Sequence, residues 1–297
     1  MANKRPGVPV KVDTPLFRQL QEETLQTLID FDAICAEHHL TYYLAGGALI
    51  GAVREGGFIP WDDDIDVHMP RADYERMLEL FGDREINHCI LFHYKTWPKY
   101  YLTFAKVVTT RPSGFIRYPY PMPVKYTRPF VDVFPLEDGY AKTPAKRVRW
   151  LRIWRDALFM KVRKYKNLSL KKRIIRRPIS KLFTYRFLQR YTEKLYRANE
   201  GKPGTDYYVA YSSPYLPKRE TNPKSAYGEP VMVTFEGRQF PAPADWDHVL
   251  RTAHKDYMKR PDPEKVKARH AVTYWDDPSG SDADGRDAPR GAAGQPG

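Results

Sequence analysis

Hydrophobic residues recur every three to four positions near the start of the chain and predict a long amphipathic helix. These positions run from Phe17 to Cys35, and Thr14-Pro15 in front of them is typical of a helix cap followed by proline in the first turn. We expect this helix to extend to about His38. Shorter apolar runs predict strands at residues 42–44, 89–94, 101–108 and 130–134, and a second helix is predicted over residues 73–80.

The second half of the chain alternates between helical and turn-rich patterns. Aromatic and aliphatic residues at helical spacing predict a helix from Trp150 to about Tyr165. We expect Pro178 to break this helical region, and a further basic helix to run from about Lys181 to Ala198. The remaining expectations are a loop at 111–129, a hairpin at 231–240, a helix at 246–258, and disorder at 1–13 and 278–297.

Length and cysteine content limit the class of protein. The 297 residues allow one large domain, or one domain with an insertion. Cys35 and Cys89 are too few for a framework of disulfides or zinc ligands, and Cys35 falls on the apolar face of the first helix. We find no stretch that resembles a signal peptide and no apolar run as long as a membrane span. These features predict a cytoplasmic protein with reduced thiols.

Positive charge is concentrated in one part of the chain. Residues 141–195 contain nineteen lysines and arginines but only two acidic residues, a net charge of +17, while the whole chain carries +13 and the remainder therefore −4. A solvated charged face, non-specific nucleic-acid binding and adsorption to an anionic membrane are the three interpretations. This charge, with two tryptophans on one helical stripe, exceeds what a solvated face usually shows, and membrane adsorption would use both the charge and the aromatic rings.

The candidate chemistry centres on an acidic run that follows Trp61. In an extended segment, Asp62, Asp64 and Asp66 would share one face, while Asp63 would point to the other and serve as a cap or a surface ion pair. Carboxylates so close together repel each other unless a cation neutralises them. The oxygen ligands suit Mg²⁺ or Mn²⁺, although an acidic surface turn is the alternative for such a run taken alone.

A glycine pair lies just upstream of the acidic run. Gly46 and Gly47 connect a predicted strand to a short apolar segment of helical character that ends near Arg54. Glycine allows a backbone to approach phosphate closely, and a helix N-terminus favours anions. Together with the aspartates, these residues predict a phosphate-binding turn beside a metal site.

The order of these glycines, arginine and aspartates resembles the signature of the LicD family, within the nucleotidyltransferase-like superfamily. The signature covers residues 46–54 and 57–66, and the similarity as a whole spans about residues 14–276. Two positions depart from the pattern: Ala48 stands where the superfamily usually has Ser or Thr, and His254-Lys255 where the family often has Tyr-Gly. Further segments that resemble the family are 71–75, 131–136, 235–237, 240–241, 256–258 and His270.

The resemblance gives possible roles to four more positions. It implies that Asp132 on a later strand is a metal ligand or a general base, although a lysine partner would equally explain a buried carboxylate. It implies that Arg54 and Lys106 bind the donor phosphate. The alternatives are an ion pair with Glu55 or Glu75 for Arg54 and solvent exposure for Lys106. His270 is expected either to contact substrate or to be structural.

Aromatic and imidazole groups near the acidic run have less specific predictions. His68 follows Asp66 by two residues, and we expect it to pack near the site rather than to bind metal. Tyr118, Tyr120 and Tyr126 could stack on a base or sugar, or hold the 111–129 loop in place.

The resemblance implies an α/β (α+β) nucleotidyltransferase-like fold: a mixed sheet with flanking helices. We expect a catalytic core at residues 14–140, a basic helical insertion at 141–200 and the C-terminal part of the catalytic domain at 201–277. The resembling family acts on glycans that are often lipid-linked. Together with the charge of residues 141–195, the resemblance therefore implies a peripheral contact with an anionic membrane at the inner face of the plasma membrane, with no specific nucleic acid as partner.

The resemblance also implies the reaction. It is the metal-dependent transfer of a substituted phosphate, phosphocholine or a polyol phosphate, from a CDP-linked donor to a hydroxyl of a cell-surface glycan or its lipid-linked precursor. Two alternatives are a nucleotidyltransferase that acts on RNA or a small molecule, and a catalytically silent membrane-docking protein.

Overall fold

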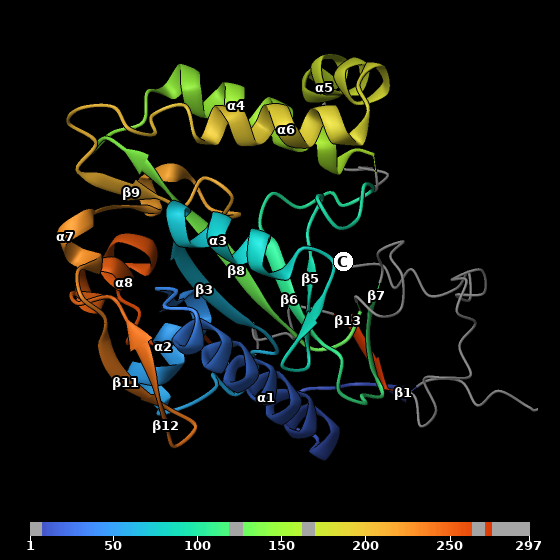
Figure 1. Cartoon of the computed structure of the whole chain (residues 1–297), viewed down its shortest axis with the longest axis vertical. Helices are drawn as coiled ribbons and strands as arrows, with labels where there is room; N and C mark the ends of the chain where they lie inside the picture. Colours follow the sequence, from blue (N-terminus) through green and yellow to red (C-terminus); the bar gives the residue numbers. More distant parts are fainter. Residues whose placement is uncertain (1–7, 119–126, 162–169, 263–270, 275–297) are drawn as a thin grey trace, which may run out of the picture.

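The computed structural model describes residues 8–118, 127–161, 170–262 and 271–274. Its centre is an eight-stranded sheet in which β3 and β8 run parallel and the other pairs are antiparallel. The predicted mixed sheet with flanking helices is confirmed (Figure 1). The strands are β2 (Tyr43–Ala45), β3 (Ile65–Pro70), β4 (Glu85–Ile86), β5 (Cys89–Phe92), β6 (Ala105–Thr109), β8 (Phe130–Gly139), β9 (Tyr207–Val209) and β10 (Thr221–Pro223).

Helix α1 (Pro15–Glu37) begins where the sequence predicts, because the Thr14 hydroxyl accepts a hydrogen bond from the Phe17 N–H at 3.2 Å. It ends one residue before His38. Its apolar face, including buried Cys35, joins the main hydrophobic core, and both α1 and α3 (Arg71–Phe81) pack on β3, β5 and β8. The helix α2 (Gly46–Glu55) connects β2 to the acidic run that precedes β3.

The C-terminal part of the chain packs back against this core. The predicted hairpin is present as β11 (Val231–Phe235) and β12 (Arg238–Ala242), and the predicted helix as α8 (Trp246–His254), four residues shorter than expected. The remaining short elements here are a 3₁₀ turn, η2 (Pro217–Arg219), and α7 (Lys224–Tyr227).

A separate three-stranded sheet corrects two expectations of irregular structure. It has the order β1 (Val8–Pro9), β13 (Ala271–Tyr274) and β7 (Phe115–Tyr118). One strand therefore lies in the segment 111–129 that was expected to be a loop, and another in the segment 1–13 that was expected to be disordered. Both strands depend on pairing with β13, which is distant in sequence, so local patterns do not show them.

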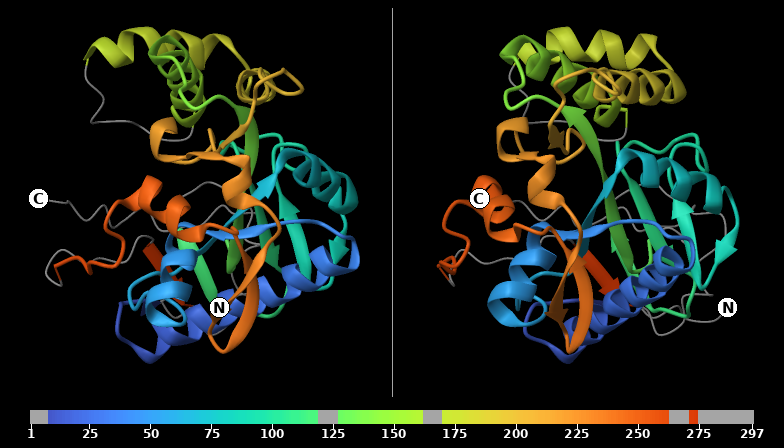
Figure 2. Two further views of the ribbon diagram at one scale, coloured as in Figure 1. Left: turned by 90° about the vertical axis from the view of Figure 1, so that its left-hand side faces the viewer. Right: turned by 60° about the vertical axis from the view of Figure 1, so that its left-hand side comes forward.

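Three helices form the insertion at one end of the sheet (Figures 1 and 2). They are α4 (Ala145–Phe159), α5 (Leu170–Leu182) and α6 (Tyr185–Tyr196), with a small core of their own around Trp154. The expectation that Pro178 breaks the helix is wrong, because it lies inside α5. Proline removes the N–H that would bond the Ile174 carbonyl, and since Ile174 is 64% exposed, water can satisfy that carbonyl instead.

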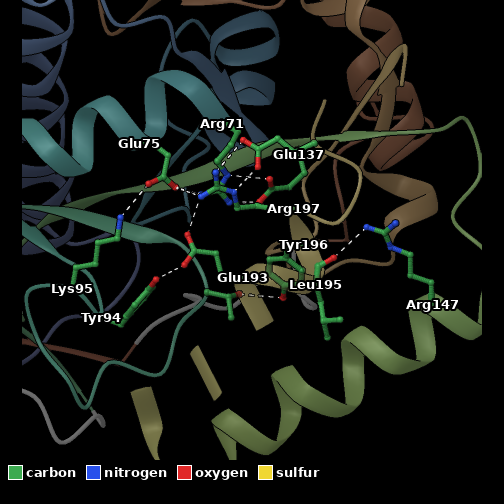
Figure 3. Close-up of polar contacts among 12 residues, drawn as sticks. Arg71, Glu75, Tyr94, Lys95, Glu137, Arg147, Glu193, Leu195, Tyr196 and Arg197 are labelled. Carbon is green, nitrogen blue, oxygen red and sulfur yellow. Dashed lines mark hydrogen bonds and ion pairs between the residues drawn. The ribbon is translucent and has the colours of Figure 1, made fainter. Parts of the chain in front are cut away.

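A buried network of charges fixes the insertion to the central sheet (Figure 3). Arg71 donates to Glu137 of β8 and to Glu75, each at 3.0 Å, and lies 3.5 Å from Glu193 of α6. Arg197, just after α6, donates to Glu75 at 3.2 Å. Arg71 directly follows β3, and Glu137 lies near the end of β8. The two parallel strands therefore both lead to this network.

Within the described part of the chain, every helix is too short or too polar to cross a bilayer.

Candidate metal centre

The acidic run lies just before β3 rather than within it. The Asp62 N–H closes a turn onto the Ile59 carbonyl at 2.9 Å, and the strand begins only at Ile65, so Asp66 alone has a strand position. Asp62 and Asp64 precede the strand, so the expectation that Asp62, Asp64 and Asp66 line one strand face is wrong. Asp63 is also not at the surface, because its side chain is completely buried.

The structure nevertheless brings five carboxylates together in two groups. One group joins Asp62, Asp63 and Asp64, and the other joins Asp64, Asp66 and Asp132; within each group, one oxygen from every residue lies within 4.8 Å of the others. Asp64 belongs to both groups. Asp132 arrives because β3 and β8 are parallel neighbours in which Asp66 and Asp132 are direct partners.

These carboxylates have the chemistry of a divalent-metal site. Asp62, Asp64 and Asp132 are buried, and Asp66 is half-buried. Buried carboxylates at this separation favour a cation between them, and oxygen donors are the ligands that Mg²⁺ and Mn²⁺ accept. The donor set therefore fits a divalent ion, while the identity of the ion stays a prediction.

Lys106 lies at the same site and contacts Asp132. The two residues are partners across the antiparallel pair β6–β8, and the Lys106 ammonium donates a hydrogen bond to Asp132 Oδ1 in a buried ion pair. The sequence allowed a lysine as the partner of Asp132, and Lys106 is that partner. The carboxylates of the metal-site group also lie beside Asp132. A phosphate-binding role for Lys106 remains a prediction.

Gly46 and Gly47 form the first residues of α2 and lie against the carboxylates. Gly46 has a φ of +52°, and a Cβ there would come within 2.9 Å of Asp66 Oδ2. A Cβ on Gly47 would overlap Asp62 Oδ2. The glycine pair therefore makes room for the aspartates at the N-terminus of a helix, where backbone N–H groups also favour anionic ligands. Ala48, one residue on, is buried in the hydrophobic core.

Arg54 is not brought to the carboxylates. It stands eight residues after Gly46 on α2, about 12 Å along the helix axis. Its guanidinium donates to Glu55 at 2.8 Å and to the Tyr257 carbonyl at 2.7 Å. The ion pair that the sequence allowed with Glu55 is the contact observed.

His68 packs beside the site as expected. It is buried on β3, its Nδ1 lies 3.0 Å from the Tyr227 hydroxyl, and burial lowers its pKa to about 4. Tyr118 is the last residue of β7. His270, Tyr120 and Tyr126 lie outside the described residues.

Two positioning residues were not identified as such from the sequence. The Gln21 side chain of α1 donates to the Asp62 carbonyl at 2.9 Å, and Glu236 accepts the Phe58 N–H at 3.0 Å while binding Arg18. Both contacts hold the segment that leads into the acidic run. Gln21 could have been noticed as a polar residue beside apolar helix positions, and Glu236 belongs to a segment that resembles the family but had no assigned role.

Comparison with known proteins finds one matching family model and several relatives. The family model described as LicD/FKTN/FKRP, nucleotidyltransferase domain, matches residues 39–170. The lipopolysaccharide cholinephosphotransferase LicD of Haemophilus influenzae is 27% identical over 270 residues, which are 86% of this chain and 96% of that protein. An uncharacterized protein of Rickettsia typhi is 32% identical over 59 residues, 19% of each chain. One of Rickettsia prowazekii is 30% identical over 60 residues, 20% of this chain and 23% of that protein.

Proposed function

Because residues 39–170 match the LicD/FKTN/FKRP nucleotidyltransferase domain, and the chain is a distant homologue of a cholinephosphotransferase over most of its length, we propose that it transfers a substituted phosphate from a CDP-linked donor to a glycan hydroxyl. The transferred group is phosphocholine or a polyol phosphate. The acceptor is a cell-surface glycan or its lipid-linked precursor, and we expect the reaction to take place at the cytoplasmic face of the plasma membrane.

One observation supports this proposal most directly. Asp64, Asp66 and Asp132 place their oxygens within 4.8 Å of one another, beside the N-terminus of α2. Transfer of phosphoryl groups depends on positioning and on neutralising charge at the phosphate, and a divalent ion held by such carboxylates supplies that charge. Residues 46–47 begin α2, and the N-terminus of a helix favours the binding of an anionic donor.

The proposed reaction needs no covalent intermediate on the protein. The acceptor oxygen forms a bond to the phosphorus that carries the head group, the bond from that phosphorus to the bridging oxygen breaks, and CMP leaves. The hydroxyl proton passes to a carboxylate, with Asp132 as the predicted acceptor. We further propose that Lys106, whose ammonium donates a hydrogen bond to Asp132, offsets charge on the donor phosphate.

Purified protein incubated with Mg²⁺, a panel of CDP-linked donors and glycan acceptors tests this function. We expect metal-dependent release of CMP, with the donor phosphate next to the head group recovered in the glycan. Asp64→Asn should abolish turnover, whereas Asp83→Asn, a matched change at an exposed aspartate, should leave it unchanged. Transfer of the nucleotide itself from another NTP would instead show a nucleotidyltransferase, and turnover that survives Asp64→Asn would contradict the proposed site.

A further inference from the structure

Exposed apolar side chains gather on the helical insertion. Among the described residues, Leu182 is 78% exposed, Ile174 64% and Ile175 54%, all on α5. Trp150 of α4 and Phe187 of α6 are also exposed, and each ring lies within 6.3 Å of the Trp154 ring. Soluble surfaces rarely group such side chains without a partner, so this face requires an explanation.

The orientation of α5 is fixed by its inner face. Arg176 is buried and forms an ion pair with Asp156 of α4 at 3.0 Å, Ser180 is buried, and Ile179 packs against the core around Trp154. At about 100° per residue, Ile174, Ile175 and Leu182 then lie within an arc of about 100° on the outer side. Figures 1 and 2 show α5 on the side of the insertion that faces away from the sheet. The apolar stripe is therefore held outward by the fold.

Exposed basic side chains occur on both α5 and α6. Arg177 and Lys181 are exposed on α5. On α6, the exposed Arg186, Arg190 and Lys194 follow one another at intervals of four residues and so share one face.

The two acidic residues of helices α4, α5 and α6 are engaged within the protein. Asp156 is bound to Arg176, and Glu193 is turned toward Arg71 and accepts a hydrogen bond from the Tyr94 hydroxyl (Figure 3). Helix α5 thus presents exposed aliphatic side chains next to the exposed Arg177 and Lys181, and α6 adds a row of exposed basic residues.

We propose that this face docks on an anionic lipid bilayer, with Ile174, Ile175 and Leu182 at the boundary between headgroups and acyl chains. An amphipathic helix with aliphatic residues on one side and lysine and arginine beside them has the chemistry of a helix that lies in a membrane interface. Burial of the aliphatic residues supplies binding, and the basic residues select anionic headgroups.

Two other partners fit this face less well. A second copy of the chain would bring two segments of net charge +17 together, so repulsion would oppose association. A nucleic acid would use the basic residues, but isoleucine and leucine offer no planar surface on which bases stack.

This inference does not depend on the proposed chemistry. Asp132 and Gly139 are separated by seven residues of β8, about 23 Å, and the insertion begins beyond Gly139. Docking can therefore be tested by binding alone, and its failure would leave the metal centre unaffected.

The test is sedimentation of the full chain with vesicles of phosphatidylglycerol and phosphatidylcholine, or of phosphatidylcholine alone. We expect binding to the anionic vesicles that weakens as salt is raised. The double variant Ile174→Ser/Leu182→Ser should weaken binding at least about tenfold, because each aliphatic side chain loses its burial. The matched control Val231→Ser/Met232→Ser removes exposed apolar groups from β11 and should bind as the wild type does.

A second variant separates charge from apolar burial. Lys181→Gln/Arg186→Gln should reduce binding to anionic vesicles while thermal unfolding stays as in the wild type, because both side chains are exposed. Equal binding of the wild type to neutral and anionic vesicles, or unchanged binding of Ile174→Ser/Leu182→Ser, would overturn the proposal. Vesicle-independent dimerisation lost in that variant would identify a second copy as the partner, and binding to RNA without vesicle binding would identify a nucleic acid.

Discussion

Asp66 of β3 and Asp132 of β8 are direct partners in the parallel strand pair at the centre of the sheet. Neighbouring strands lie about 4.8 Å apart, so this register alone brings together two carboxylates that are far apart in sequence. Asp64, immediately before β3, completes the group. The metal centre is thus made by one local acidic run and by one strand pairing.

Substitutions in this group should weaken metal binding. Asp66→Asn and Asp132→Asn keep the shape of the side chain and remove one negative ligand each. We expect metal affinity to fall by at least about 100-fold, since even the loss of an outer-shell partner typically costs 10–100-fold. Titration with Mn²⁺, followed by calorimetry, measures this change, and Asp83→Asn serves as the exposed control. Wild-type affinity in both variants would show that the ion, if bound, is held elsewhere.

Much of the site's surroundings could be predicted from local sequence. Thr14 caps α1, and Gly46-Gly47 begins a helix beside the acidic run. Each of these features depends on residues only a few positions apart, which is the range over which caps and turns act. Asp132 could also be proposed, because a carboxylate in an apolar strand requires a partner.

What the sequence could not show depends on strand register and on contacts between residues far apart in the chain. The contact of Lys106 with Asp132 follows from the pairing of β6 with β8, which no local pattern encodes. The contact of Arg54 with the Tyr257 carbonyl joins residues about 200 positions apart, so it could not be seen in the sequence, and a phosphate-binding role for Arg54 stays a prediction. Asp63 was assigned to the surface because the strand was assumed to start too early.

Lys106 and a bound cation should compensate for one another at Asp132. Lys106→Met removes a buried ion-pair partner, which typically lowers the free energy of unfolding by about 3–5 kcal/mol. Because a divalent ion would neutralise the same carboxylate, we expect Mg²⁺ to raise the Tm of this variant more than that of the wild type. Lys95→Met, which removes a partly exposed ammonium 3.1 Å from Glu75, is the control and should show the wild-type response to Mg²⁺. An equal or smaller rise in Tm with Mg²⁺ in Lys106→Met would argue against the idea that Lys106 and the cation neutralise the same carboxylate.

Two glycines of α2 should differ in what their replacement disrupts. A Cβ at position 47 overlaps a carboxylate oxygen of Asp62, whereas a Cβ at position 51 overlaps the backbone carbonyl of Gly57. Gly47→Ala should therefore weaken metal binding while unfolding is little affected, because alanine favours the helix by about 1 kcal/mol. Gly51→Ala should lower stability, since the backbone of the adjoining turn must move. Mn²⁺ titration measures the metal affinity of both variants, and urea unfolding measures their stability. Normal metal binding by Gly47→Ala would contradict this prediction.

Glu220 should make stability depend on pH in a direction unusual for a carboxyl group. It is fully buried beside the Ser213 hydroxyl, and burial raises its pKa to about 7 from an ordinary value of 4.5. Between these two values the folded state holds a proton that the unfolded state has released, so the contribution of Glu220 to stability falls as pH rises from about 4.5 to about 7. The full shift corresponds to about 3 kcal/mol.

The variant Glu220→Gln isolates this effect. His68 and His93 act in the opposite sense, because burial lowers the pKa of both, so the wild-type profile alone mixes several groups. Glutamine can still accept the hydrogen bond from Ser213 but does not titrate, and the variant should therefore gain stability relative to the wild type as pH is raised from 5 to 7.5. Urea unfolding of the two proteins across this range measures the difference, and a difference that does not change with pH would show that Glu220 titrates normally in the folded chain.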